Sequence, residues 1–463
     1  MGYDLTKNVF SSREAYLSVI KLKDDVGGGI WIRSLIHPEW GTGRQKISTL
    51  LLKLIPTTIE GHICGYSIEA NATFVKLNTI QGYIKLSFEK YNTIRISTYR
   101  AALFAEFGHQ NNQGIIDYVD DKQFSLFYHH LKQDIHLKVQ HGNININEEL
   151  KRIRFNVHAN DMIEFSFWPR NLKHPEVYTH FKDNHTIDLD YQRFKSFFIT
   201  SSDMDELAVY HLWMLPYVKV GLLQSDTIAV SKNHMSLIWS WDHLLNAFAL
   251  MHASPKLGWD TVFLFLYMQK PDGMLPDAVN PVTCVDWYTK PPVYGYFLNK
   301  YEKHGFYLPK DKEQFVYESL VKLTHWWIKS NDSFPVYQKP FDSGWDNATC
   351  FDDGGNATTP DLVSYLIIQM DYLCKLASRL SKDVESMDWA RQRDKLLSSF
   401  ISTFWNGNEF MYRNDKGEVK NTTSLIRMIP LILEHLLPME VAQKMIDELK
   451  LEILTEEKDF NKI

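Results

Sequence analysis

The period of the hydrophobic pattern changes from two to about 3.6 near Thr200, so one fold class cannot describe the whole 463-residue chain. Before this point, short alternating or β-branched segments are separated by turn residues, as in an antiparallel β-sandwich. These segments are residues 30–36, 62–68, 73–78, 82–89, 93–99, 151–159 and 162–168. The polar stretch from Asp183 to Asp203 then reads as a loop. The pattern predicts a multi-domain α+β protein, with a β-sandwich and linker over residues 1–200 and a helical domain over residues 201–463.

The second half of the chain contains nine segments with helical periodicity, separated by loops that tend to alternate between long and short. They are residues 206–223, 240–254, 259–269, 291–305, 313–330, 359–380, 389–405, 424–436 and 439–451. Paired antiparallel helices indicate a solenoid, and a solenoid that closes on itself is an α/α toroid whose long loops gather at one rim. We therefore expect the chemistry of this protein to lie at such a rim.

The segment from Phe341 to Asn347, FDSGWDN, places an acid beside a large aromatic residue on a turn that contains glycine. Gly344 allows the backbone to approach a ligand closely, and Trp345 offers a flat apolar face to a pyranose ring. We expect Asp346 to be buried beside this face, which would disfavour its charged form and make it a proton donor for a leaving-group oxygen. The alternative interpretation is a helix start with a packed aromatic residue.

A second motif, WSWDH, opens the helical segment that follows Trp239. Asp242 in a first helical turn is favoured by the helix dipole, so it could accept hydrogen bonds from sugar hydroxyls beside Trp241. An acid at this position is equally consistent with a residue that only stabilises the helix dipole. We expect His243 to be a core or capping histidine, since no His and Asp set in the chain has the spacing of metal ligands.

A third motif, YMQKPDGMLPD, contains Gln269 at the end of a helical segment and then Asp272, Gly273 and Asp277. Gln and Asp side chains can bind the vicinal hydroxyls of a sugar, although Pro-Asp-Gly is also an ordinary turn. If the loops of the toroid converge at one rim, acids at 242, 272 and 346 share a cleft with Trp241 and Trp345. The joint occurrence of the three motifs favours a sugar site more than any one of them.

Charge and motif content argue against several other functions. The net charge of −6 and the lack of a basic block with interleaved aromatics disfavour nucleic acid and anionic membranes as partners. The sequence has no nucleophile elbow, Walker loop or dinucleotide-binding fingerprint, so we expect no cofactor and no metal. The four cysteines, Cys64, Cys284, Cys350 and Cys374, are far apart and read as free thiols. Neither a signal peptide nor a membrane span is evident, which predicts a cytoplasmic location.

The order of these motifs, WSWDH, YMQKPDGMLPD, KPP at Lys290–Pro292 and FDSGWDN, resembles the (α/α)6 catalytic domain of glycoside hydrolase family 63. That family includes bacterial mannosylglycerate-hydrolase-like and α-glucosidase-like members. The motifs are more distantly similar to those of family 37 trehalases. The N-terminal stretches 8–19 and 29–37 resemble the β-sandwich that precedes the barrel in bacterial relatives.

The resemblance implies roles for individual residues. The aspartate of the SGxD motif is the general acid in that family, which implies this role for Asp346, with Asn347 beside it. Trp241 and Asp242 match the pair that contacts the sugar, and Gln269 and Trp345 match positions that line the −1 subsite. Asp272 and Gly273 belong to the same substrate-binding set. The family inverts the anomeric carbon, which requires a second carboxylate roughly 6.5 to 9.5 Å from the first.

The resemblance predicts hydrolysis of small α-linked glucosyl or mannosyl substrates in carbohydrate metabolism. However, the family's general base is a glutamate after a Trp-Arg-Gly-Pro-like segment, and neither is found in this chain. Nine helical segments, where a closed toroid has twelve, predict an incomplete barrel. The chain would then be truncated, completed by a second polypeptide, or inactive. The alternative function is a catalytically inactive carbohydrate-binding pseudoenzyme or fragment, and a third hypothesis is a sugar epimerase that uses His243.

Overall fold

The computed structural model describes residues 2–23, 28–37, 49–90, 92–107, 114–120, 123–128, 133–141, 144–147, 154–169, 172, 184–233, 235–328, 334–352 and 355–460. The chain divides into two compact units. Unit 1 comprises Met1–Ile238, Ala249–Leu264 and Val279–Cys284, and unit 2 comprises Trp239–Phe248, Phe265–Ala278 and Val285–Ile463. The division into domains at residue 200 stays a prediction.

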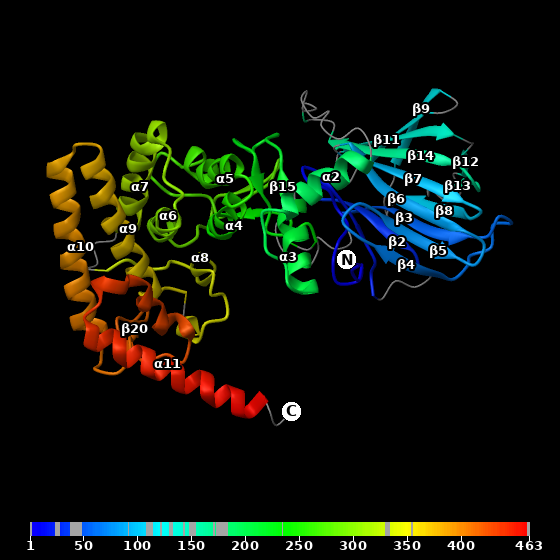
Figure 1. The fold of residues 1–463 in the computed structure, drawn as a ribbon. Coiled ribbons are helices and arrows are strands. Elements are labelled where there is room, and N and C mark those ends of the chain that lie inside the picture. Colours follow the sequence, from blue (N-terminus) through cyan, green and yellow to red (C-terminus); the bar gives the residue numbers. More distant parts are fainter. Residues whose placement is uncertain are drawn as a thin grey trace. The chain divides into compact units, whose positions relative to one another are not determined.

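Two large antiparallel sheets lie in unit 1 (Figure 1). The six-stranded sheet has the order β1 (Leu17–Ile20), β2 (Ile30–Ser34), β3 (Leu50–Thr57), β8 (Ala102–Phe107), β13 (Arg154–Val157) and β12 (Ile144–Asn147). The eight-stranded sheet has the order β4 (Tyr66–Ala70), β5 (Val75–Thr79), β6 (Tyr83–Lys90), β7 (Thr93–Tyr99), β14 (Met162–Pro169), β11 (Gln133–His141), β10 (Gln123–Tyr128) and β9 (Gly114–Asp120).

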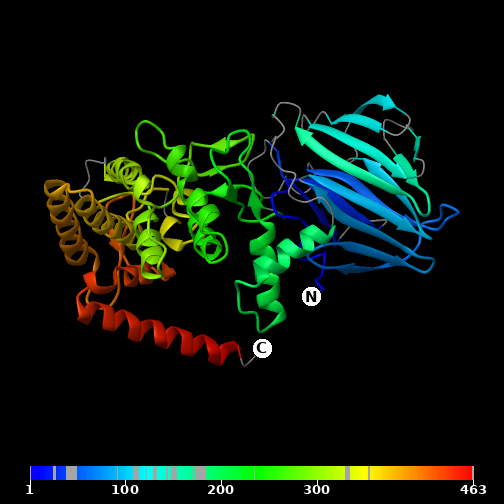
Figure 2. The same cartoon turned by 45° about the horizontal axis from the view of Figure 1, so that its top comes forward.

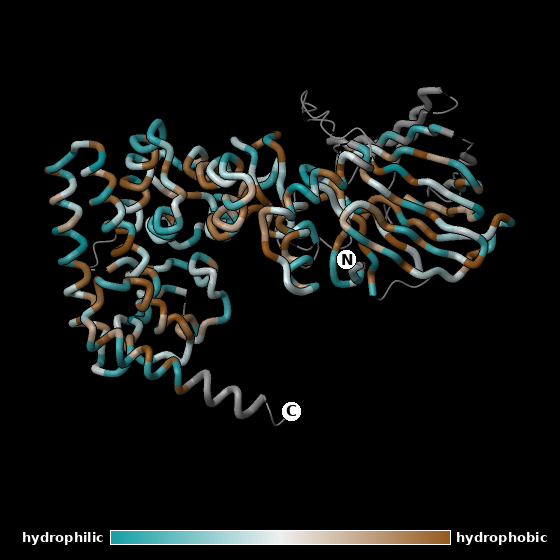
Figure 3. Tube along the Cα trace, in the orientation of Figure 1, coloured by the Kyte–Doolittle hydropathy of each residue, from teal (hydrophilic) through white to brown (hydrophobic). Residues whose placement is uncertain are grey.

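The two sheets pack face to face, and Figure 2 shows them as two layers. The ring of Phe107 in β8 lies 6.2 Å from that of Phe165 in β14. Successive side chains of a strand point to opposite faces of the sheet, which explains this packing. In β7, Ile94 and Ile96 are buried and Arg95 between them is half-buried. Figure 3 shows the same alternation as apolar and polar colours along the strands.

The stretch predicted as a polar loop, Asp183 to Asp203, contains helix α2 (Asn184–Lys195), so this prediction was wrong. The reason is a narrow apolar stripe in an otherwise polar segment. Ile187, Tyr191 and Phe194 have the spacing i, i+4, i+7 and are all buried, so one face of the helix enters the core. The next helix, α3 (Asp203–Met214), begins with a capping box in which Ser202 and Asp205 bond each other's backbone N–H groups.

The predicted helical segment 206–223 is shorter in the structure than expected. Helix α3 ends at Met214 because Pro216 follows, and Pro216 begins the short strand β15. Further two-residue strands are β15 (Pro216–Tyr217), β16 (Thr227–Ile228), β17 (Ile238–Trp239), β18 (Ala278–Val279), β19 (Cys284–Val285), β20 (Tyr412–Arg413) and β21 (Val419–Lys420).

Helices dominate the chain after residue 240. They are α4 (Asp242–Met251), α5 (Pro255–Tyr267), α6 (Tyr294–Lys303), η2 (Lys310–Lys312), α7 (Glu313–Ile328), α8 (Pro340–Ser343), η3 (Thr349–Phe351), α9 (Pro360–Arg379), α10 (Asp383–Phe404), η4 (Leu425–Leu436) and α11 (Met439–Phe460). The border between the units runs through α4 and α5.

Helix α9 is the centre of unit 2. Every residue from Pro360 to Leu373 is buried, because this helix packs against α6, α7, α10 and η4. A helix that is covered on all sides must be apolar all round, and its sequence LVSYLIIQMDYL is close to that. Val363, Ile367 and Ile368 of α9 meet Phe400 and Phe404 of α10 in one hydrophobic cluster. Segment 424–436, predicted as a helix, is the 3-10 helix η4 with Pro430 inside it.

The predicted fold class is confirmed, since antiparallel sheets precede a helical domain. Within the described part of the chain, no helix has both the length and the apolar character that crossing a bilayer demands.

Candidate active site

The segment FDSGWDN forms a short helix followed by a tight left-handed turn. Helix α8 ends at Ser343, and Gly344 adopts φ +71° as its C-cap. The Ser343 hydroxyl stabilises the turn, because it donates to the carbonyl of Pro340 (2.6 Å) and accepts from the backbone N–H of Trp345 (2.9 Å). The residues before Gly344 and the residues after it therefore lie in different surroundings.

The indole of Trp241 packs directly against Gly344. A Cβ atom placed on Gly344 would lie 2.2 Å from Cζ2 of Trp241, so only glycine fits there. Trp241 immediately precedes α4, and Gly344 follows α8. The motifs WSWDH and FDSGWDN therefore meet. This contact brings two of the three motifs together, while a cleft shared by Asp242, Asp272 and Asp346 with Trp241 and Trp345 stays a prediction.

Behind this contact lies a buried cluster of charged groups centred on Lys290. Its ammonium lies 3.0 Å from Oδ1 of Asp277, and the two side chains are 9% and 2% exposed. Lys290 also donates a hydrogen bond to the carbonyl of Phe341. Lys290 of the KPP motif thus joins two of the predicted motifs, through a buried ion pair to one and a hydrogen bond to the other.

Two further acids belong to the Lys290 cluster, Asp242 and Asp342. Burial raises the pKa of Asp242 above its ordinary value, and Lys290 partly opposes this shift. Burial likewise raises the pKa of Asp342, while the backbone N–H of Thr289, which donates to Oδ1 of Asp342 (3.2 Å), opposes the shift. Asp277 adds to both upward shifts by like-charge repulsion. The cluster therefore favours retention of protons by its acids.

Asp342 was missed by the sequence reasoning. The available signal was its place directly after Pro340 and Phe341 in the first turn of a short helix, where an acid can accept a backbone N–H from another segment. Lys290 was noted only as part of the KPP motif. A lysine that must enter the core needs an acid beside it, and that pairing is visible only in three dimensions.

Asp346 lies on the other side of the turn and is exposed, as is Asn347. The expectation that Asp346 is buried beside the aromatic wall was wrong. The left-handed Gly344 reverses the chain direction, so the buried acid of this segment is Asp342 and the acid that faces solvent is Asp346.

Aromatic side chains flank the exposed part of the segment. Trp241 and Trp345 are half-buried, and the indole N–H of Trp345 is buried without a hydrogen-bond partner among the described residues. Phe341 is 44% exposed and meets the ring of Tyr288 edge-on at 5.7 Å. Lys339 lies over that Tyr288 ring, 4.4 Å from its centre. A flat, partly exposed aromatic surface suits a ligand with apolar faces, such as a sugar ring.

The third motif is held by helix α7. Gln269 donates through Nε2 to the carbonyls of Gly273 and Ser319, both at 2.9 Å. Asp272 accepts from the backbone N–H of Met274 and from Nε1 of Trp326, both at 3.1 Å. These bonds fasten the turn to α7, whereas Trp241 and Asp242 contact the FDSGWDN segment and the Lys290 cluster.

Gly273 and His243 are both enclosed by the packing of the fold. Gly273 adopts φ +102°, and a Cβ there would lie 2.3 Å from the carbonyl oxygen of Lys322. His243 is fully buried, with Nδ1 near the carbonyl of Trp239 (3.1 Å) and Nε2 near the hydroxyl of Tyr294 (3.0 Å). Burial lowers the pKa of His243 to about 3, so it is neutral. The prediction that His243 is a core histidine is confirmed, and the epimerase hypothesis loses its histidine.

The comparison with protein families matches residues 235–453 to the mannosylglycerate hydrolase MGH1-like glycoside hydrolase domain. Residues 235–453 are therefore similar to this family of glycoside hydrolase domains. The chain therefore contains a glycosidase domain, and the predicted relationship to this hydrolase group is confirmed. No curated protein matches the chain.

Solved structures share the fold at low sequence identity. A bacterial glucoamylase complexed with acarbose is 12% identical, with a TM-score of 0.54, and the match covers 87% of this chain and 68% of the other. A family GH92 α-mannosidase from Bacteroides thetaiotaomicron is 9% identical, with a TM-score of 0.56, and the match covers 91% and 65% of the two chains. A GH63 mannosylglycerate hydrolase from Thermus thermophilus is 16% identical, with coverage of 46% and 70% and a TM-score of 0.40. The first two likenesses support the predicted toroidal fold.

Proposed function

We propose that this protein hydrolyses α-linked glucosyl or mannosyl substrates with inversion, and that Asp346 is the general acid. The observation that carries the proposal is the contact between Trp241 and Gly344. It supports the proposal because Trp241, proposed to contact the sugar together with Asp242, packs against the turn that carries Trp345 and Asp346. The substrate is a small oligosaccharide or glycoside.

In this proposal the sugar ring stacks on the aromatic surface that Trp241 and Trp345 form. Asp346 is exposed before the sugar binds. A bound sugar displaces water from the carboxyl group, so the proton passes to the leaving-group oxygen and not to solvent. The substrate thus supplies the low-polarity surroundings that the free protein does not.

The remaining parts of the proposal extend beyond these contacts. Gln269, Asp272, Gly273 and Asn347 are proposed to complete the substrate-binding set. The protein is proposed to act in the cytoplasm in carbohydrate metabolism, with a β-sandwich over residues 1–200 and the catalytic domain over residues 201–463. The comparisons lend no support to a second polypeptide that completes the barrel.

Hydrolysis of a panel of α-linked disaccharides and glycosyl-glycerates tests the proposal, with product anomers followed by NMR. Asp346→Asn keeps the shape of the side chain and removes its proton, so hydrolysis should fall by about 10² to 10⁴-fold while sugar binding persists. The matched control is Asp415→Asn, since Asp415 is an exposed aspartate in another turn of unit 2.

Three outcomes separate the alternatives. Unchanged turnover in Asp346→Asn removes Asp346 from the mechanism. Sugar binding without turnover in the unaltered protein supports the inactive binding protein instead. Retention of configuration contradicts inversion even if the sugar is cleaved.

A further inference from the structure

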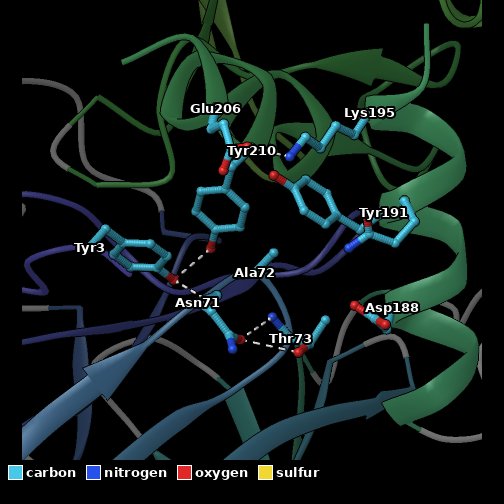
Figure 4. A pocket seen from close by; sticks show the side chains of 10 residues that line it. Tyr3, Asn71, Ala72, Thr73, Asp188, Tyr191, Lys195, Glu206 and Tyr210 are labelled. Carbon is cyan, nitrogen blue, oxygen red and sulfur yellow. Dashed lines mark hydrogen bonds and ion pairs between the residues drawn. The ribbon is translucent and has the colours of Figure 1, made fainter. Parts of the chain in front are cut away.

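Unit 1 contains a polar pocket that takes no part in the candidate active site. Its volume is about 130 Å³, and it lies between helix α2 and the turn from Asn71 to Thr73 that follows strand β4 (Figure 4). Helix α2 presents Asp188, Tyr191 and Lys195 to it, at the spacing i, i+3, i+7 that places side chains on one helix face. Tyr3 and Tyr210 complete the wall.

Several side chains in the walls of the pocket already have partners. The hydroxyl of Tyr3 donates to that of Tyr210 and lies near the carbonyl of Asn71, both at 3.0 Å, and the two rings stack at 5.0 Å. Lys195 and Glu206 form an ion pair between α2 and α3. Because these bonds exist without a ligand, the shape of the pocket does not depend on one.

Tyr191 is the unusual member of the wall. It is 7% exposed, and its ring is fixed edge-on against Trp213 at 5.3 Å and Tyr210 at 6.2 Å. Its hydroxyl has no hydrogen-bond partner among the described residues and is open to the pocket, where it can bond to water or to a ligand. Figure 4 shows this side chain projecting from α2 into the pocket. A ligand hydroxyl could satisfy it.

Two further groups face the pocket with unused hydrogen-bonding capacity. The side-chain oxygen of Asn71 accepts from the backbone N–H groups of Thr73 and Phe74, both at 2.9 Å, which fixes the amide so that its NH₂ group is the end left for a ligand. The carboxylate of Asp188 has no hydrogen-bond or ion-pair partner within the described part of the chain. The pocket therefore offers a strong acceptor in Asp188, an amide donor in Asn71, and the hydroxyl of Tyr191, which can donate or accept a hydrogen bond.

The charges of the pocket argue against an ionic ligand. Lys195 is paired with Glu206, so it does not supply a free cation for an anion. A single carboxylate, Asp188, is too few ligands for a metal ion, which prefers several oxygens. Neutral hydroxyl groups can donate to Asp188 and accept from Asn71, and an apolar ring or carbon face can lie on the tyrosine rings.

We propose that this pocket binds a neutral polyhydroxyl compound, such as a single sugar ring or a short polyol, separately from the candidate active site. A cavity of about this volume admits one six-membered ring, with substituents that extend through the opening. The inference does not rest on the proposed function, because no residue of the pocket lies in the matched stretch 235–453.

The test measures binding of glucose, mannose and glycerol by saturation-transfer NMR and calorimetry in a Trp345→Ala background, which weakens the candidate active site. Binding should persist in this background. Adding Asp188→Asn or Tyr191→Phe should weaken binding at least about tenfold, because each removes one hydrogen-bonding function and keeps the side-chain shape. Hexoses binding more tightly than glycerol identifies a sugar site, and the reverse order identifies a polyol site.

Controls keep the test decisive. Asp203→Asn is the matched control for Asp188→Asn, because Asp203 is an exposed acid on α3 that does not line the pocket. Ala72→Leu fills the pocket from the opposite wall and should abolish binding, while circular dichroism verifies folding. No binding of any of the three probes in the Trp345→Ala protein overturns the inference, as does binding that Asp188→Asn, Tyr191→Phe and Ala72→Leu all leave unchanged.

Discussion

Two acids in the same seven-residue segment, Asp342 and Asp346, have opposite surroundings. Asp342 is 5% exposed, accepts a backbone N–H and lies within the Lys290 cluster. Asp346 is exposed, beside the half-buried Trp345. The left-handed Gly344 between them causes the difference. An acid that stabilises the fold and an acid that is available to a substrate can therefore come from one short motif, and the spacing alone does not tell which is which.

Among the substitutions predicted here, loss of Lys290 from the buried cluster should lower the stability most. Lys290→Met removes the cation that lies beside the buried Asp277, which should lower the free energy of unfolding by about 4 kcal/mol in urea denaturation. Lys270→Met is the control, since the ion pair of Lys270 with Asp286 is largely exposed and should contribute less than about 1 kcal/mol. Equal effects of the two substitutions would show that the cluster is not the stabilising element. The double variant Lys290→Met with Asp277→Asn should recover part of the loss.

A buried acid on α9 should make the stability depend on pH. Asp361 is fully buried, accepts a hydrogen bond from the hydroxyl of Tyr337 (2.9 Å), and burial raises its pKa to about 6. A raised pKa means that the folded protein holds the proton more tightly, so this contribution is complete below about pH 4 and is lost as the pH rises through 6. The loss is on the order of 3 kcal/mol. Urea denaturation at pH 4 to 8 should show this loss in the unaltered protein and not in Asp361→Asn.

The turn that separates the two acids can be tested by adding one methyl group. Gly344→Ala combines a positive φ with a clash against Trp241, and it should lower the free energy of unfolding by about 2 kcal/mol and weaken sugar binding. Gly417→Ala isolates the backbone strain, because Gly417 has φ +80° and open space around its Cα. Identical losses in both variants would mean that the contact with Trp241 contributes nothing.

The smallest effect is expected at Trp345, on the exposed part of the segment. Trp345→Ala removes a stacking face, so sugar affinity should fall by about 1 kcal/mol in calorimetry with little change in stability. Tyr307→Ala, at an aromatic residue that is 68% exposed, controls for the loss of surface aromatic area. An unchanged affinity would assign Trp345 to packing instead of binding.

The sequence predicted the order of sheets and helices well because the period of its pattern differs clearly between the two halves. It failed where the pattern is weak. Helix α2 was taken for a loop because Ile187, Tyr191 and Phe194 are a thin stripe among polar residues. Strand β3 was missed because all of its residues are buried and its sequence does not alternate.

The candidate site was predicted in part. The motifs that contain Trp241 and Gly344 were expected to meet, and they do. The burial of Asp342 instead of Asp346 was not foreseeable, because it depends on the conformation of one glycine and on a backbone N–H of Thr289 from a distant segment. Local patterns predict which residues can do chemistry, and tertiary contacts decide which of them are left free to do it.

The contact between Trp241 and Gly344 also provides a way to monitor the folding of this protein. The two residues approach only when α4 and the turn after α8 have both reached their final places, so a sugar that stacks there senses the completed tertiary structure and not the helices alone. Ligand affinity in unit 2 is therefore a probe of native packing, and a compact intermediate with all its helices formed would bind no sugar at this position.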